Sequence, residues 1–277
     1  MDDDQFRRWT RLLEERTGIV LPAERKSFLV TSLGLRMREI GCSSYQEYFE
    51  KLTRGRGDLV EWSTLVDRLT VHETRFFRHP ASMELVRGYA LAKEPEAQGK
   101  CKSIHAWSAG CSTGEETYTL AMVIDRALRE RETTGYFGVT GTDISQPALG
   151  LAREGLYTRR RMKDLPADFM EEYFTACSAE RYRVCDRLRK RTCFARMNVL
   201  DAASERIGKM DIVYCQNLLI YFARSRRESI VNDMVEHLLP GGLLILGSGE
   251  LVGWRHPNMQ KVNSVHTLAY RRCSGAR

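Results

Sequence analysis

Apolar side chains recur at helical spacing over the first part of the chain. Phe6 and Trp9 fall on one side of a predicted helix, and a second apolar stripe occupies residues 29–40. Two shorter stripes follow. Helices that carry such stripes pack against one another and leave their charged faces outside. Residues 1–69 are therefore expected to form a small all-helical N-terminal domain, followed by a linker at residues 70–80.

Beyond the linker, short apolar runs alternate with helical stripes. The apolar runs lie at residues 104–107, 137–142, 210–215 and 243–247. Alternation of strands and helices predicts a mainly parallel sheet that is covered on both faces. Residues 81–277 are therefore assigned to the α/β class, as a doubly wound sheet. In such sheets, ligands bind at the carboxyl ends of the strands.

Composition limits the class of protein. The 277 residues are 43% hydrophobic and 29% charged, without repeats, which excludes disordered, collagen-like and coiled-coil chains. The longest apolar run, at residues 238–246, is interrupted by Pro240 and is much shorter than the roughly 20 residues of a membrane span. Met1 is followed by three aspartates, unlike the basic start of a secretory signal. The protein is expected to be cytoplasmic and not inserted in a membrane.

The eight cysteines and the net charge add two expectations. The cysteines form no C-x-x-C pair, and no histidine stands at zinc-finger spacing, so most are predicted to be buried reduced thiols and no metal is expected. The net charge of +7 favours a negatively charged partner. Arg25 belongs to a basic face of the N-terminal helices, which is predicted to be solvated, with a docking surface as the alternative.

A glycine-bearing turn follows the first predicted strand. Gly110 and Gly114 allow a ligand to approach the backbone, and the helix that starts after them supplies unpaired N–H groups. A nucleotide phosphate loop would continue with Lys and Ser or Thr, whereas here Gly114 is followed by Glu115 and Glu116. Two carboxylates repel phosphate and attract a cation. The turn therefore predicts a positively charged ligand.

Asp143 ends the second predicted strand. An acid in this position after a glycine turn can accept both hydroxyl groups of a ribose. A glycine turn and a ribose acid without a phosphate clamp match S-adenosylmethionine, which combines adenosine, an amino acid and a sulfonium cation. Either feature is weak by itself. The alternative role for Asp143 is to cap the helix that begins before Pro147.

Four separated motifs resemble the CheR-type chemotaxis receptor methyltransferases. The motifs are residues 70–78 (TVHETRFFR), residues 107–122 (WSAGCSTGEETYTLAM), Asp143 with Ile144, and residues 215–222 (CQNLLIYF). They occur in the right order, and the resemblance covers nearly the whole chain. It implies an S-adenosylmethionine-dependent protein-glutamate O-methyltransferase. Such an enzyme transfers methyl groups to glutamate side chains in the cytoplasmic domain of methyl-accepting chemotaxis proteins during chemosensory adaptation, and it releases S-adenosylhomocysteine.

The resemblance also implies two further parts of the fold. One is an antiparallel strand that closes the sheet, at residues 265–271. The other is a small β-subdomain inserted at about residues 165–197, which touches the receptor in the family. Residues 182–184 and 192–194 flank a charged turn and are expected to form a hairpin of that subdomain.

Roles of individual residues follow from the resemblance. Arg78 and Tyr221 are the expected catalytic residues, Arg78 by a forked hydrogen bond to the cofactor carboxylate and Tyr221 beside the transferred methyl group. The expected cofactor-binding residues are His72, Thr74, Arg78, Glu116, Asp143, Asn198, Val199, Gln216 and Asn217. His72 stands where many relatives have asparagine, and Gln216 where relatives often have arginine.

Two other functions compete with this interpretation. The arginines of residues 159–161 and 181–191 fit an acidic receptor helix, but arginine runs also suit nucleic acid. The strand at residues 210–215 ends in Cys-Gln-Asn-Leu, without the proline-rich aromatic turn expected for methylation of a base, so nucleic acid is not the expected partner. In the non-enzymatic alternative, the fold binds the cofactor only as a sensor or scaffold. Taken singly, Arg78 could also be a surface ion pair and Tyr221 a core aromatic.

Overall fold

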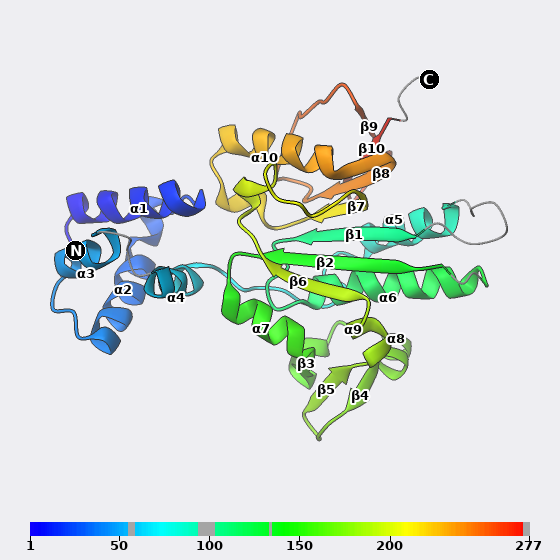
Figure 1. Ribbon diagram of the computed structural model, residues 1–277, viewed down its shortest axis with the longest axis horizontal. Coiled ribbons are helices and arrows are strands. Elements are labelled where there is room, and N and C mark those ends of the chain that lie inside the picture. The colour runs from blue at the N-terminus through cyan, green and yellow to red at the C-terminus, as the bar shows by residue number, and fades with distance from the viewer. Residues whose placement is uncertain (55–58, 94–102, 133–134, 274–277) are drawn as a thin grey trace.

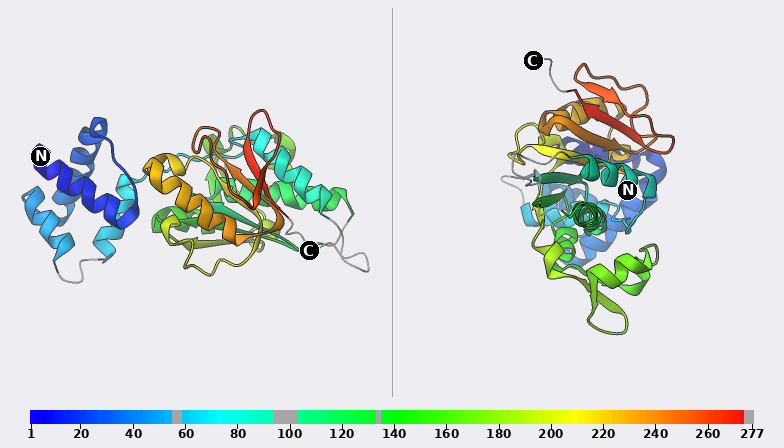
Figure 2. Two further views of the ribbon diagram at one scale, coloured as in Figure 1. Left: turned by 90° about the horizontal axis from the view of Figure 1, so that it is seen from above. Right: turned by 90° about the vertical axis from the view of Figure 1, so that its right-hand side faces the viewer.

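The computed structural model describes residues 1–54, 59–93, 103–132 and 135–273. The N-terminal helices and the sheet lie side by side along the longest axis of the molecule (Figures 1 and 2). Figure 1 shows the helices beside the end of the sheet at which β1 (Ile104–Ala109) and β2 (Phe137–Asp143) finish. The carboxyl ends of these strands therefore face a second structural unit.

The N-terminal helices, called here the helical region, form a core of their own. They are α1 (Asp3–Thr17), α2 (Lys26–Ile40), α3 (Tyr45–Thr53) and α4 (Leu59–Leu69), with the short η1 (Ala23–Arg25) before α2. The predicted apolar stripes meet inside it, where Trp9, Leu29 and Leu33 are buried. A buried carboxylate is paired in the same core: Arg36 donates to Glu61 through Nε at 2.9 Å and Nη2 at 2.5 Å.

The main sheet has the order β6-β2-β1-β7-β8-β10-β9. Its other strands are β6 (Thr192–Arg196), β7 (Met210–Cys215), β8 (Leu238–Leu246), β9 (Met259–Lys261) and β10 (Leu268–Arg272). The strands from β6 to β8 are parallel, and β10 runs antiparallel to β8. The predicted mainly parallel sheet with an antiparallel closing strand is thus confirmed. β8 begins earlier than predicted and includes Pro240, with an irregular register opposite β7.

Helices cover both faces of the main sheet. One face packs against α5 (Pro80–Ala92), α6 (Glu115–Glu130) and α7 (Gln146–Glu154), and the other against α10 (Arg224–His237). Alternate residues of β7 serve the two cores, with Ile212 on the α6 side and Val213 on the α10 side. Among the described helices, none is long and apolar enough to cross a membrane.

A small antiparallel sheet follows α7 and has the order β3-β5-β4. Its strands are β3 (Leu156–Thr158), β5 (Arg181–Val184) and β4 (Phe174–Ala176), and the segment also contains η2 (Arg159–Met162), α8 (Ala167–Tyr173) and α9 (Asp186–Arg189). The predicted subdomain at about residues 165–197 overlaps this small sheet only in part. The predicted hairpin is wrong, because β5 pairs with β3 and β4 whereas β6 pairs with β2. Phe194 of β6 packs on Tyr118 of α6, a contact that holds β6 in the main sheet.

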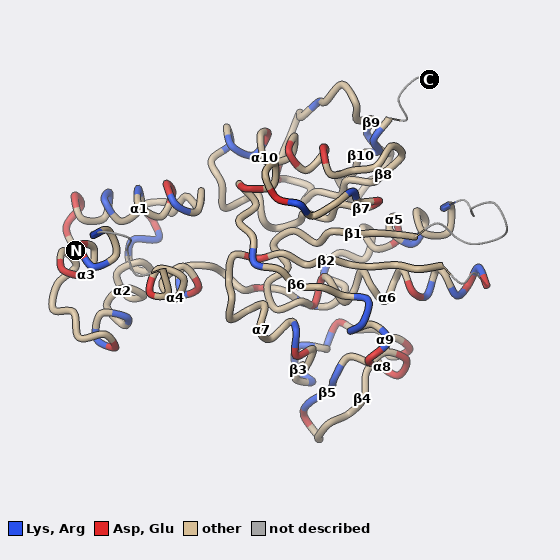
Figure 3. Tube along the Cα trace, viewed as in Figure 1, with Lys and Arg blue, Asp and Glu red and all other residues tan. Residues whose placement is uncertain are grey.

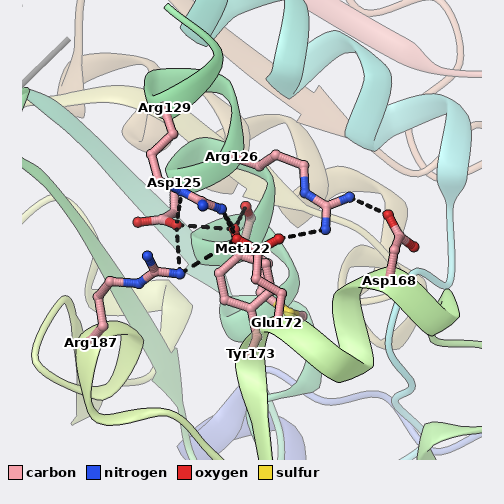
Figure 4. A network of polar contacts seen from close by, with 8 residues as sticks. All are labelled: Met122, Asp125, Arg126, Arg129, Asp168, Glu172, Tyr173 and Arg187. Atoms are coloured by element: carbon pink, nitrogen blue, oxygen red, sulfur yellow. Dashed lines mark hydrogen bonds and ion pairs between the residues drawn. The ribbon is translucent and has the colours of Figure 1, made fainter. Parts of the chain in front are cut away.

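A charge network attaches α8 and α9 to α6 (Figure 4). Its members are Asp125, Arg126, Arg129, Asp168, Glu172, Tyr173 and Arg187. Tyr173 is fully buried and donates to Asp125 at 3.0 Å, while Arg126 donates to Glu172 at 2.7 Å. Exposed ion pairs stabilise a fold little. The hydrogen bond of the buried Tyr173 is therefore expected to contribute most of the stability of this network. Through it, the small sheet is fixed to the main fold.

The described cysteines are free thiols, and their burial differs from the prediction. Cys111 and Cys215 are buried, whereas Cys177, Cys193 and Cys273 are exposed. The exposed thiols lie outside the hydrophobic cores: Cys177 follows β4, Cys193 is on the edge strand β6, and Cys273 follows β10. The expectation that most cysteines are buried is therefore wrong for the part of the chain that the structure describes; Cys101 lies outside it.

Asp211 ties three elements together at the amino end of the sheet. Its carboxylate is fully buried and accepts hydrogen bonds from Lys93, from the Tyr89 hydroxyl at 3.1 Å and from the His105 N–H at 2.9 Å. Tyr89 and Lys93 belong to the α5 segment and His105 to β1. Removal of this carboxylate leaves several buried donors without an acceptor.

We therefore expect Asp211→Ala to lower the free energy of unfolding by about 3 kcal/mol, because it breaks a buried ion pair and strands its donors. Urea denaturation monitored by circular dichroism measures the change. The exposed Asp201 offers a control, and Asp201→Ala should change stability by less than about 0.5 kcal/mol. Equal effects of the two substitutions would contradict the role of Asp211.

Candidate functional site

A cleft lies between the carboxyl ends of β1, β2 and β7 and the helical region. All ten site residues expected from the sequence line it: His72, Thr74, Arg78, Glu116, Asp143, Asn198, Val199, Gln216, Asn217 and Tyr221. The helical region contributes Thr17, Ile19, Val20, Leu21 and Arg25 to the same lining. The fold thus brings together side chains from positions far apart in the sequence.

The turn after β1 forms one wall of the cleft and depends on its glycines. Gly110 and Gly114 have φ of +74° and +94°, and a Cβ atom at Gly114 would lie 2.8 Å from Ala152 Cβ. Ser112 between them also has a left-handed φ of +50°. The Ser112 hydroxyl is buried and has no hydrogen-bond partner among the described residues. Ser112 is a lining residue of the cleft.

Only one of the two glutamates of the turn faces the cleft. Glu116 lines it and accepts a hydrogen bond from Ser108 Oγ at 2.7 Å. Burial raises the pKa of Glu116 to about 8, with the nearby Arg78 opposing that effect. Glu115 is fully buried behind the turn, where Arg161 Nη1 lies 2.6 Å from its carboxylate. The prediction that both carboxylates attract a cation is wrong, because consecutive helical residues point in different directions.

Asp143 stands at the end of β2 beside this turn. Its two oxygens accept N–H groups, Oδ1 from Ser145 at 2.9 Å and Oδ2 from Ser112 at 2.8 Å. Burial raises the pKa of Asp143, and these two N–H groups oppose the rise. The cap of α7 is Ser145, whose hydroxyl accepts the Ala148 N–H at 3.1 Å. The alternative role of Asp143 as the cap of that helix is therefore excluded.

The segment that links α4 to α5 lines the cleft next to Asp143 and Glu116. His72 Nε2 lies 3.0 Å from Thr70 Oγ1 and 3.1 Å from the carbonyl oxygen of Asp67, at the end of α4. Arg78 donates through Nη1 to the carbonyl of Glu73 at 2.8 Å, but its Nη2 is 4.0 Å from the exposed Glu73 carboxylate. An ion pair this long and exposed contributes little. The Arg78 guanidinium keeps donors for a ligand.

Gln216 and Asn217 of the loop after β7 line the cleft and differ in character. Gln216 is buried, and its amide binds the Tyr214 hydroxyl at 2.5 Å, Ser82 Oγ at 3.1 Å and the Leu246 carbonyl at 3.0 Å. Its polar atoms are thus largely committed within the protein. Asn217 has a left-handed φ of +60° and accepts from His79 at 2.8 Å if His79 Nε2 carries the proton.

Tyr221 ends this loop and touches the helical region. Its carbonyl accepts the Val20 N–H at 2.8 Å, and the next residue, Phe222, forms an isolated antiparallel bridge with Ile19. Burial raises the pKa of Tyr221, and Arg25 and Arg78 lower it, so both guanidinium groups lie near the phenol. The phenol of Tyr221 is therefore neutral at pH 7 and can donate a hydrogen bond.

The opposite wall carries the pair expected to hold an adenine ring. Asn198 Oδ1 accepts the Leu200 N–H at 3.1 Å and so caps η3 (Val199–Asp201). Its Nδ2 donates to the carbonyl of Thr17 at 3.3 Å, which is another contact with the helical region. Val199 is buried and presents an apolar surface to the cleft.

Two residues at or beside the cleft were not expected there from the sequence. Arg25, expected on a solvated face, lines the cleft. Glu250 is buried after β8, accepts the Gly247 N–H at 3.0 Å and has the Asn217 and Ile220 N–H groups close to its carboxylate. Glu250 thus supports the loop that carries Tyr221. The position of Glu250, an acidic residue just beyond a predicted strand, was the sequence feature that could have identified it.

No group of three or more His, Cys, Asp or Glu side chains in the described part of the chain is arranged to hold a metal ion. The donor set of the cleft is instead suited to an organic ligand with both charges. Glu116 and Arg78 both line the cleft, and the positive charge of Arg78 opposes the rise in the pKa of Glu116. A zwitterionic amino acid presents the complementary ammonium and carboxylate.

Comparisons with known proteins agree with this geometry. The family model described as CheR methyltransferase, SAM binding domain matches residues 72–268, and the model of the CheR all-alpha domain matches residues 4–70.

Similar proteins include chemotaxis protein methyltransferase 1 of Pseudomonas aeruginosa, 31% identical over 94% of this chain and 94% of that protein. The chemotaxis protein methyltransferase of Escherichia coli is 30% identical over 90% of this chain and 85% of that protein. That of Borreliella burgdorferi is 27% identical over 90% and 88%. The chain therefore belongs to the CheR methyltransferase family and carries its S-adenosylmethionine-binding domain.

Proposed function

We propose that this methyltransferase esterifies glutamate side chains in the cytoplasmic domain of methyl-accepting chemotaxis proteins, with S-adenosylmethionine as methyl donor. Its similar proteins are named chemotaxis protein methyltransferases. The observation that carries the proposal is the convergence of all ten expected side chains on one cleft. With receptors as substrates, the protein works in the cytoplasm.

The cleft fits each part of the cofactor. Glu116 accepts hydrogen bonds from the ammonium of its amino acid part, and Arg78 donates to the carboxylate. Asp143 accepts hydrogen bonds from the ribose hydroxyl groups. The unpartnered Ser112 hydroxyl, next to Asp143, is a further polar partner. Asn198 and Val199 flank the adenine. Bound in this way, the cofactor supplies an electrophilic methyl group on a sulfonium.

The acceptor needs no general base. A glutamate side chain with a pKa near 4.3 is more than about 99% ionised at pH 7, so it is already a nucleophile. The residues of this chain therefore have two tasks: they orient the reactants and they shield them from water. The neutral phenol of Tyr221 donates a hydrogen bond to the acceptor carboxylate, and Arg25 and Arg78 add positive charge near it. The helical region covers the site through the Val20–Tyr221 hydrogen bond and excludes water.

Basic residues lie on and beside the small sheet (Figure 3). Arg159, Arg160, Arg181 and Arg183 are exposed, and their side chains make no hydrogen bond or ion pair with the described residues. These four arginines suit a glutamate-rich receptor helix. Phosphates would also suit them, so a nucleic acid methyltransferase is the competing function.

Transfer of labelled methyl separates these functions. The proposal expects label on receptor as a base-labile ester and none on RNA. Label on RNA would favour the competing enzyme, and binding of cofactor without any transfer would favour a sensor or scaffold.

Asp143→Ala should weaken binding of S-adenosylhomocysteine about 100-fold, because two hydrogen bonds to a charged acceptor, together worth about 3 kcal/mol, are lost. Isothermal titration calorimetry measures this. Asp201→Ala, on the exposed surface, is the matched control and should bind normally. Retention of affinity within twofold by Asp143→Ala would remove Asp143 from the ribose site.

Tyr221→Phe should lower kcat for receptor methylation about tenfold, the effect of one lost orienting hydrogen bond. Cofactor affinity should stay within twofold, because the phenol is proposed to act on the acceptor. Steady-state kinetics combined with calorimetry tests both statements. Unchanged turnover would show that the hydroxyl group has no orienting role.

Cofactor affinity should rise with pH between about 6 and 8. With a pKa of about 8, Glu116 is mostly protonated at pH 7, whereas an ammonium group binds the ionised carboxylate. Binding at pH 7 should therefore release close to one proton, about 0.9 per site. Calorimetry in buffers of different ionisation enthalpy counts these protons. Glu116→Gln should abolish the release, and an unchanged release in that variant would assign it to another group.

A further inference from the structure

The structure separates one arginine from its two neighbours in η2. Arg161 Nη1 donates to Glu115 Oε1 and to Thr113 Oγ1, both at 2.6 Å. The side chains of Arg159 and Arg160 are exposed and make no such contact with the described residues. The sequence grouped all three arginines as a docking cluster for an acidic partner. Arg161 is also partly exposed to solvent, but its guanidinium contacts the back of the turn that forms one wall of the cleft.

The contact between Arg161 and Glu115 matters for stability because Glu115 is buried. Its carboxylate is fully buried, and burial raises its pKa, while the Arg161 guanidinium and the Thr113 hydroxyl oppose that rise. Thr113 Oγ1 donates to Glu115 Oε2 at 2.6 Å. Arg161 thus neutralises a charge that would otherwise be stranded in the interior, which is a costly state for a protein.

A second residue of the same segment holds the turn. Tyr157 of β3 is buried, and its hydroxyl donates to the carbonyl of Thr113 at 2.7 Å. Thr113 is therefore held by its side chain and by its backbone. It stands between Ser112 and Gly114, both with left-handed backbone angles, so the turn has a conformation that needs support from outside.

The supported turn meets the cleft on its other side. Its Ser112 N–H binds Asp143 at 2.8 Å, and its Glu116 faces the ligand. A displacement at Thr113 or Glu115 would therefore move the groups proposed for the ribose and the ammonium together. Shifts of this kind at remote residues can alter binding strongly when groups must be held in a fixed geometry.

We propose that Arg161 and Tyr157 are positioning residues for cofactor binding: from the small-sheet segment, they fix the turn at residues 110–116 through Thr113 and Glu115. The inference rests on the proposed use of the cleft by S-adenosylmethionine. It makes the small sheet a structural support of the cofactor site, in addition to any surface that it offers to a partner.

Two substitutions test the proposal in the full chain with S-adenosylhomocysteine as the probe. Arg161→Gln should weaken binding about tenfold, and Tyr157→Phe about threefold, because each removes contacts with the turn and leaves the cleft side chains in place. The KM for S-adenosylmethionine should rise by the same factors, with kcat at saturating cofactor within about twofold. A loss of general stability alone would not move KM in this selective way.

The chain offers matched controls for both changes. Lys163→Gln removes an exposed basic side chain two positions beyond Arg161, and Tyr182→Phe removes the hydroxyl of the tyrosine paired with Tyr157 across the small sheet. Both controls should bind S-adenosylhomocysteine like the unsubstituted protein. If Arg161→Gln does not fold, the binding affinity of Tyr157→Phe tests the proposal by itself. This variant is expected to fold because it keeps the aromatic ring and all charges.

The outcomes are distinct from those that test the function. If the folded Arg161→Gln and Tyr157→Phe variants both bind the probe within 1.5-fold of the unsubstituted protein, the positioning role is overturned while the proposed function stands. If the unsubstituted protein itself does not bind the probe, the proposed function fails. A double variant, Glu115→Gln with Arg161→Gln, should bind more tightly than Arg161→Gln, because no charge is then buried without a partner.

Discussion

The left-handed turn at residues 110–116 is the constraint on which the rest of the site depends. Glycines at its two bends allow a backbone path that a Cβ atom would block, and Ser112 is held in the same unfavourable region. The Ser112 N–H binds Asp143 on one side, and Thr113 is bound from the small sheet on the other. One short segment thus shapes the cleft wall and also carries Glu116.

The helical region is part of the site as well as a neighbour of it. It contacts the loop after β7 through the Val20–Tyr221 hydrogen bond and the start of η3 through the contact between Asn198 and Thr17. Arg25 places a positive charge near the phenol of Tyr221. The transfer of a methyl group to an anion requires no proton transfer, but it requires that the reactants are oriented and that water is excluded. A site assembled from the helical region and the main sheet meets these two requirements.

The sequence predicted the helices and strands better than it predicted the contacts between them. Periodicity gave the helices of the helical region and the strands β1, β2 and β7, because apolar spacing is a local property. The resemblance to a family gave the ten lining residues. The hairpin across β5 and β6 was wrong, since strand pairing depends on contacts between residues distant in the sequence. β6 pairs with β2, and its Phe194 contacts Tyr118 of α6. The prediction that most cysteines are buried failed because burial also depends on contacts between segments distant in the sequence.

What the sequence determined by itself was the order of the elements, the glycine turn, and the kinds of charged group near the strand ends. It could not distinguish Glu115 from Glu116, or Arg161 from Arg160, because neighbours of the same chemical type carry the same local signal. The tertiary structure decided that Glu115 is buried against Arg161 while Glu116 lines the cleft, and that Arg161 and not Arg160 pairs with a buried carboxylate. Burial and ion pairing arise only when distant segments pack together.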